Sequence, residues 1–160
     1  MVRIDDRLTE LGLVLPPEVQ APLGVALPFA FVNLRGDRAL ISGHGPQSPD
    51  GALAPPFGRV GAEVSLEEAV TAARLTALSM LGSLQRTLGS LDRITGWLRV
   101  FGMVNSAPGF DRQPTVINGF SELILDVFGP EVGRHSRSAV GMAALPFGIP
   151  VEIEAEVGIR

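Results

Sequence analysis

The spacing of apolar residues between positions 65 and 89 predicts a long amphipathic helix. Six apolar residues recur at intervals of three and four and so share one face: Val70, Ala73, Ala77, Leu81, Leu84 and Leu88. The run Ser65-Leu66-Glu67-Glu68 is a capping box, in which Ser65 accepts from a free backbone amide and Glu68 reaches back to the cap. Gly89 is a natural stop.

Two further helices are expected. One runs from Pro114, a favourable first-turn residue, to Phe128, with Gly129-Pro130 closing it. Its apolar face holds Ile117, Phe120, Ile124 and Val127. A shorter helix over residues 5–12 ends at Gly12. Residues 16–28 contain four prolines and are expected to form an extended arm.

The other apolar runs predict five strands. Residues 29–34 and 38–42 flank Gly36-Asp37 and indicate a β-hairpin. Residues 93–104 are apolar on both faces, with Ile94, Leu98, Val100 and Val104 on one side and Trp97, Phe101 and Met103 on the other. A strand of this kind is buried on both faces. Helices can cover one face, and another subunit is the simple candidate for the second.

Two strands are expected at about 136–145 and 150–158, joined by a turn at Pro146-Phe147-Gly148. The order β-β-α-β-α-β-β predicts an α+β fold, with two helices packed on one face of a mixed sheet. With 160 residues, one domain spanning 1–160 is expected, with residues 1–26 as an N-terminal arm. Residues 43–61, rich in glycine and proline, form a long loop, which is often functional.

Composition narrows the function. Hydrophobic residues make up 46% of the chain and charged residues 19%, which favours burial of apolar surface between subunits. The net charge of −4 and the lack of a basic cluster argue against nucleic acid as a partner. The chain has no cysteine and only two histidines far apart, so we expect no disulfide and no metal site. No segment resembles a signal peptide or a membrane span, and a soluble cytoplasmic protein is expected.

Arg137 is the first candidate for chemistry. Small residues follow it on the same strand face, namely Ala139, Gly141 and Ala143, and they would leave room for a ligand. A guanidinium matches a carboxylate with two parallel hydrogen bonds. From these residues alone, Arg137 is either a solvent-facing arginine on an edge strand or the anchor of an anion.

Three other sets of residues also allow both a structural and a functional interpretation. Glu152, Glu154 and Glu156 share one strand face, which is either solvated or holds Glu152 as a general base in a cleft. The Ser42-Gly43-His44-Gly45 segment either forms a turn or offers backbone amides to an anion. Asn118 either faces solvent or turns its amide toward a ligand near the start of its helix.

Taken together, these segments resemble the RidA/YjgF family of enamine and imine deaminases. Three segments near the C-terminus are similar to the family signature: Ser136-Arg137-Ser138-Ala139-Val140, Ala144-Leu145-Pro146 and Val151-Glu152-Ile153-Glu154-Ala155. Ile41-Ser42-Gly43 and the Asn118 helix also resemble family segments, and the similarity runs from about residue 27 to 158.

The resemblance implies a fold like that of the Bacillus-type chorismate mutase and a homotrimer with pockets between subunits. It implies that Arg137 binds the substrate carboxylate, that Glu152 places the attacking water, and that Asn118, Ser42 and Gly43 line the pocket. The implied reaction hydrolyses enamines or imines of the 2-aminoacrylate type to 2-keto acids and ammonia, without a cofactor.

The chain departs from the family pattern at three pocket positions. Phe29 stands where a tyrosine is common, Ala139 where cysteine is frequent, and His44 where glutamine usually follows Ser-Gly. These changes motivate an alternative function, a non-catalytic trimer that binds keto acids or related small carboxylates. Ribonuclease action is disfavoured by the acidic charge, and chorismate-mutase chemistry by the single good pocket cation.

Overall fold

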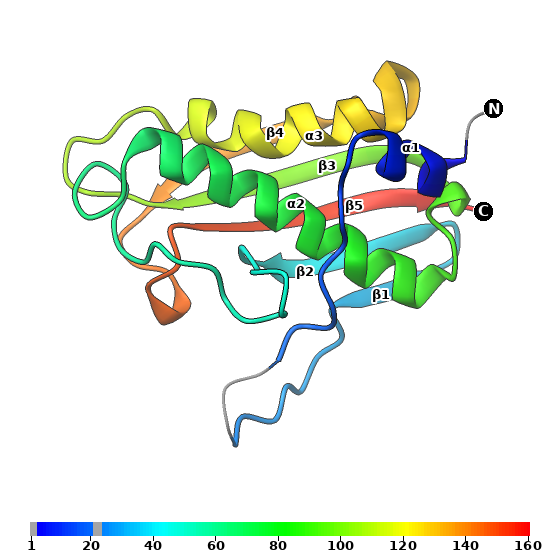
Figure 1. The fold of residues 1–160 in the computed structure, drawn as a ribbon, viewed down its shortest axis with the longest axis horizontal. Helices are drawn as coiled ribbons and strands as arrows, with labels where there is room; N and C mark the ends of the chain where they lie inside the picture. The colour runs from blue at the N-terminus through cyan, green and yellow to red at the C-terminus, as the bar shows by residue number, and fades with distance from the viewer. Residues whose placement is uncertain (1–2, 21–23) are drawn as a thin grey trace.

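The computed structural model describes residues 3–20 and 24–160 (Figure 1). The long helices are α2 (Leu66–Leu88) and α3 (Gln113–Gly133), and α1 (Ile4–Glu10) precedes the sheet. The strands are β1 (Val32–Arg35), β2 (Arg38–His44), β3 (Ile94–Asn105), β4 (Ser136–Met142) and β5 (Val151–Ile159). Two short 3-10 helices, η1 (Leu91–Arg93) and η2 (Pro146–Gly148), join elements. The expected order of elements is confirmed.

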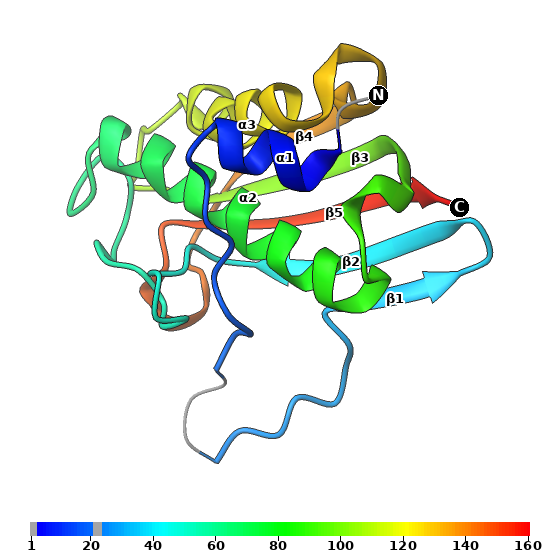
Figure 2. The ribbon, with the colours of Figure 1, turned by 45° about the vertical axis from the view of Figure 1, so that its right-hand side comes forward.

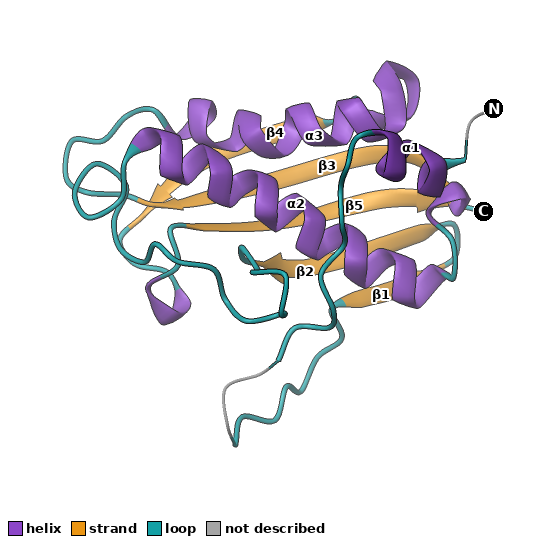
Figure 3. Cartoon of the chain, viewed as in Figure 1, coloured by secondary structure: helices purple, strands orange, loops and turns teal. Residues whose placement is uncertain are grey.

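The five strands form one mixed sheet in the order β1-β2-β5-β3-β4. Only the β3–β4 pair is parallel, and the other neighbours are antiparallel. Helices α2 and α3 lie side by side over one face of the sheet, and β4 forms the edge beneath α3 (Figures 1 and 3). The predicted α+β architecture, with two helices on one face of a mixed sheet, is therefore confirmed.

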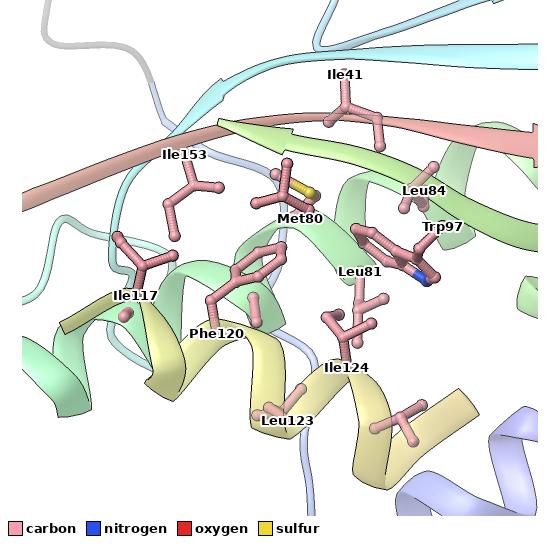
Figure 4. Close-up of a cluster of buried hydrophobic side chains, with 14 of the residues drawn as sticks. Ile41, Met80, Leu81, Leu84, Trp97, Ile117, Phe120, Leu123, Ile124 and Ile153 are labelled. Atoms are coloured by element: carbon pink, nitrogen blue, oxygen red, sulfur yellow. The ribbon is translucent and has the colours of Figure 1, made fainter. Parts of the chain in front are cut away.

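The core lies between the two helices and the sheet (Figure 4). Its largest members include Met80, Leu81 and Leu84 from α2 and Phe120 from α3, all fully buried. The capping box of α2 forms as predicted, and Gly89 ends the helix in the left-handed conformation at φ 79°. In α3, Gly129 leaves the helical region at φ 74° and ψ 172°, so the regular part of the helix stops where expected.

The predicted faces of β3 are wrong near its start. Trp97 is 2% exposed and packs edge-on against Phe120, while Leu98 is 41% exposed. The register explains the change. Trp97 pairs with Val157 and Arg99 pairs with Glu156, so β3 advances by two residues where β5 advances by one. One extra residue in β3 is a bulge, and a bulge shifts the alternation of the side chains before it. Trp97 therefore joins Val100 and Val104 on the helix-covered face.

The hairpin strand also begins later than predicted, at Val32 rather than Phe29. Between α1 and β1 the described residues contain neither helix nor strand, and the arm crosses α2 before it turns toward β1 (Figure 2). Part of the expected arm, residues 21–23, lies outside the described residues. Arg86 of α2 and Gln47 donate hydrogen bonds to the carbonyls of Pro16 and Pro17, which fasten the arm to the body. No helix in the described part is long and apolar enough to cross a membrane.

Candidate functional site

The guanidinium of Arg137 lies at the edge of the sheet and is held by α3. Its Nη1 donates to Asn118 Oδ1 at 2.9 Å and to Ser121 Oγ at 3.1 Å, and its Nη2 donates to the Pro114 carbonyl at 3.3 Å. Arg137 is half-buried, and this burial lowers its pKa. Within the described residues, Nε donates no hydrogen bond. Nε and the second N–H of Nη2 are therefore left as donors for a carboxylate.

Ser121 and His135 extend this network, and the sequence interpretation missed both. His135 Nδ1 lies 2.7 Å from the Gly133 carbonyl, so Nδ1 carries the proton. Nε2 then accepts from the Ser121 hydroxyl at 2.9 Å, which leaves the Ser121 lone pairs for Arg137. The spacing contained a usable signal, because Ser121 follows Asn118 by three residues and shares its helix face.

Glu152 lies elsewhere, beside the end of β2. A methyl group built on Gly43 would overlap the Glu152 carboxylate, so the two residues are in direct contact. The half-buried carboxylate has a raised pKa, first because burial disfavours the charge and second because Glu154 is near. No hydrogen bond or ion pair reaches it from any residue that the structure describes.

A cavity of about 360 Å³ opens beside Glu152, and most of its walls are apolar. Phe29 and Phe31 line it from the segment before β1, Leu53 from the long loop, and Phe147 and Ile149 from the turn before β5. Gly43 and His44 also border it. Of the residues predicted to form a pocket, Phe29, Gly43 and Glu152 therefore lie together.

Ser42 and His44 are engaged in structural hydrogen bonds. The Ser42 hydroxyl donates to the Ala30 carbonyl at 2.8 Å. His44 is 1% exposed, and its Nδ1 donates to the Ser42 carbonyl at 2.7 Å while Nε2 lies 2.9 Å from Ser83 Oγ. Burial, with Arg86 as a smaller cause, lowers the pKa of His44 to about 4. His44 is thus a neutral residue of the β2–α2 contact.

Arg137 and Glu152 stand on opposite faces of the sheet within one chain. Arg137 pairs with Val100, which is fully buried under the helices, and so points to the helix-covered side. Glu152 pairs with Met103, three residues further along β3 and therefore on the other side. Two strand spacings also separate β5 from β4, about 10 Å in all. One chain cannot bring both side chains to one small ligand.

The remaining predicted residue, Ala139, lies two positions after Arg137 on the same face and is half-buried against the core. Asn118 is exposed, and its side-chain Oδ1 accepts the hydrogen bond from Arg137. Among the described residues, no group of three or more His, Cys, Asp or Glu side chains gathers in a way that could hold a metal ion.

The sheet order and the helix layer define an α+β protein of the chorismate mutase-like type. A sequence model described as "YjgF/chorismate mutase-like, putative endoribonuclease" matches residues 5–150. The chain belongs to this RidA/YjgF family, as the resemblance indicated.

Three relatives cover almost the whole chain. Protein TCP17 of Trypanosoma cruzi is 40% identical over 158 residues, which are 99% of this chain and 95% of that protein. Among solved structures, Atu1372 of Agrobacterium tumefaciens is 39% identical with a TM-score of 0.86, covering 98% of this chain and 94% of its own. A "putative endoribonuclease" of Shewanella oneidensis is 30% identical with a TM-score of 0.87, covering 99% of this chain and 100% of its own.

Proposed function

We propose that this protein hydrolyses reactive enamine or imine acids of the 2-aminoacrylate type to 2-keto acids and ammonia. The observation that carries the proposal is the Arg137 guanidinium, which α3 fixes by three hydrogen bonds while Nε and the second N–H of Nη2 have no acceptor in the described chain. A rigid, half-buried fork of this kind suits a carboxylate. Membership of the RidA/YjgF family supports the same reaction.

In the proposed mechanism, Arg137 binds the carboxylate and orients the neighbouring imine carbon, since orientation alone lowers barriers strongly. Glu152 accepts the proton of a water molecule as its oxygen bonds to that carbon. Glu152 returns that proton to the imine nitrogen, which gives a carbinolamine, and then carries the hydroxyl proton of the carbinolamine to the amino nitrogen. As the second proton is transferred, the carbon–nitrogen bond breaks, the carbonyl group of the keto acid forms, and ammonia leaves. The raised pKa of Glu152 suits a group that takes and returns a proton.

This mechanism requires two copies of the chain, because Arg137 and Glu152 face opposite sides of one sheet. We propose a homotrimer with pockets between subunits. The sheet face without helices carries apolar side chains that suit a contact with another copy. Leu40 is 41% exposed there, and Phe101 is half-buried beside it in a hollow of about 570 Å³.

The reaction is tested with imino acids that an amino-acid oxidase generates in place. We expect the purified protein to speed keto-acid and ammonia release over buffer, and we expect Arg137→Ala to remove this effect without unfolding the chain. A panel of imino acids that all hydrolyse at the buffer rate would overturn the proposal.

The shared pocket is tested by mixing two inactive variants, Arg137→Ala and Glu152→Gln. If each pocket takes its arginine and its glutamate from different chains, random co-assembly restores about a quarter of the wild-type activity. If each variant stays inactive in the mixture although mass measurement shows mixed trimers, the pocket is not shared in this way. Light scattering of the wild type gives the assembly state.

The alternative function, a non-catalytic trimer that binds keto acids or related small carboxylates, is favoured by one observation. Phe29 lines the cavity at Glu152 and has no hydroxyl group with which to hold a ligand or a water molecule. Calorimetry with 2-keto acids separates the two functions, because binding without any turnover of imino acids supports the sensor.

A further inference from the structure

The cavity beside Glu152 is larger than a 2-aminoacrylate needs. It measures about 360 Å³, which is within the range of pockets that hold molecules of a dozen or more heavy atoms. The family resemblance leaves this volume unexplained, since a three-carbon imino acid fills only a fraction of it.

The walls of the cavity are aromatic and aliphatic on several sides. Phe29 and Phe31 stack edge-on with ring centres 5.6 Å apart, and Leu53 and Ile149 close other sides. Glu152 is the charged side chain among the cavity residues, and it has no partner in the described chain. The cavity thus combines one charged group and the neutral polar residues Gln20, His44 and Gln47 with a large apolar space.

Phe147 supports a role in binding. Its φ is 59°, a left-handed conformation that a non-glycine residue with a bulky side chain rarely adopts. The side chain is 63% exposed although it is apolar, and it stands at the cavity. An exposed phenylalanine held in a strained backbone points to a contact that the free chain does not make.

We propose that this cavity receives the side chain of the substrate, and that the substrate is a 2-imino acid with a large apolar side chain, aromatic or branched aliphatic. The inference rests on the proposed function, because Glu152 in the cavity wall has to face the imine carbon. The carboxylate then extends out of the cavity toward Arg137 of a second copy, and the apolar group packs among Phe29, Leu53 and Phe147.

The experiment compares imino acids that an amino-acid oxidase generates from phenylalanine, leucine and alanine. Burial of the additional carbons predicts a kcat/KM about tenfold or more higher for the two large substrates than for the small one. Equal rates, or a faster alanine-derived substrate, overturn the inference while deamination stands.

Two variants test the location. Leu53→Trp fills the cavity, so it should lower kcat/KM for the large substrates about tenfold and leave the alanine-derived substrate within about threefold. Phe147→Ala should weaken the preference for large substrates, whereas the matched control Phe57→Ala, an exposed phenylalanine outside the cavity, should not. An unchanged preference in both cavity variants, each folded by circular dichroism, overturns the inference.

A binding measurement separates this inference from the proposed reaction. Calorimetry with phenylpyruvate and pyruvate compares a large and a small keto acid of the same charge. Tighter binding of phenylpyruvate with no turnover of any imino acid keeps the cavity assignment and rejects deamination. Equal binding of the two acids, or binding of neither, rejects the cavity assignment.

Discussion

Gly43 lies against the carboxylate of Glu152, so closely that a Cβ atom at position 43 would overlap it. A side chain at position 43 would push against the end of the flexible Glu152 side chain, which can move aside. Both residues are half-buried. Gly43→Ala is therefore expected to displace the carboxylate while costing less than about 1 kcal/mol of stability. Turnover of imino acids should fall at least tenfold, because a small misplacement of a catalytic group has a large effect on rate.

The matched control is Gly96→Ala. Gly96 is also a strand glycine without positive φ, and no atom lies within 4 Å of the point where a Cβ atom would stand. Steady-state kinetics and thermal melts on both variants are the measurement. Equal activity of Gly43→Ala and the wild type would show that the carboxylate position next to Gly43 is irrelevant to the reaction.

Glu152→Gln is expected to stabilise the protein and abolish its activity. Burial raises the pKa of Glu152, so the folded state holds the proton more firmly than the unfolded chain does. The contribution of the Glu152 carboxyl group to the stability of the fold therefore declines as pH rises above the ordinary pKa of 4.5, and at pH 7 it is lower than in acid. Because the side chain is partly open to solvent, the gain on neutralising it is about 0.5 kcal/mol.

Urea unfolding at pH 7 and pH 4 checks this prediction. The gain should be present at pH 7 and be much smaller at pH 4, below the ordinary value of 4.5, where the carboxyl group is mostly protonated in both states. Glu18→Gln, which removes a carboxylate from an exposed residue of the arm, serves as the control. A loss of stability at pH 7 in Glu152→Gln would contradict the prediction.

Much of the fold could be predicted from local patterns. The capping box at Ser65 and the alternation of Val151, Glu152 and Ile153 are short-range signals, and the structure confirms both. The bulge in β3 could not be predicted, because it depends on how Arg99 aligns with Glu156 on a strand far away in the sequence. Register is set by such pairings between strands, which one strand's own pattern does not contain.

Part of the candidate site could likewise be predicted from local sequence, and part could not. Arg137 and Asn118 were predicted from sequence, and the structure brings them within 2.9 Å. His135 was missed because its two hydrogen bonds, to the Gly133 carbonyl and to Ser121, come from a chain path that leaves α3 and enters β4. The sequence also could not predict that the sheet separates Arg137 from Glu152. Both residues lie among small or apolar neighbours in similar strands, and only the topology decides which face each one occupies.

His44 should make the protein sensitive to acid. Its pKa is lowered from 6.5 to about 4, because burial disfavours the imidazolium. The unfolded chain therefore takes up a proton at a pH where the folded chain does not, and stability falls as pH drops from 6.5 to about 4. The loss amounts to about 3 kcal/mol over this range. His135 contributes in the same direction, since its pKa is lowered too.

The variant His44→Gln separates this effect. Glutamine can still donate and accept a hydrogen bond but does not titrate, so the variant should lose less stability than the wild type between pH 6.5 and about 4. His135→Gln is the comparison. It should reduce the slope of stability against pH by less than His44→Gln does, because His135 is only half-buried. Denaturant melts across this pH range give the slopes, and parallel slopes for His44→Gln and the wild type would contradict the assignment.

Ser121 is expected to control how well Arg137 binds a carboxylate. The proton of its hydroxyl goes to His135, so its oxygen can accept from Nη1 of Arg137 at 3.1 Å. Ser121→Ala removes one of the three hydrogen bonds that fix the guanidinium. A less well oriented guanidinium should bind a 2-keto acid about 1 kcal/mol more weakly, which raises the Kd about fivefold. Ser138→Ala is the control, because Ser138 is exposed on β4 and pairs with Phe101 on the opposite face. Calorimetry on the two variants and the wild type distinguishes the outcomes, and equal Kd values for all three would mean that α3 does not need Ser121 to hold Arg137.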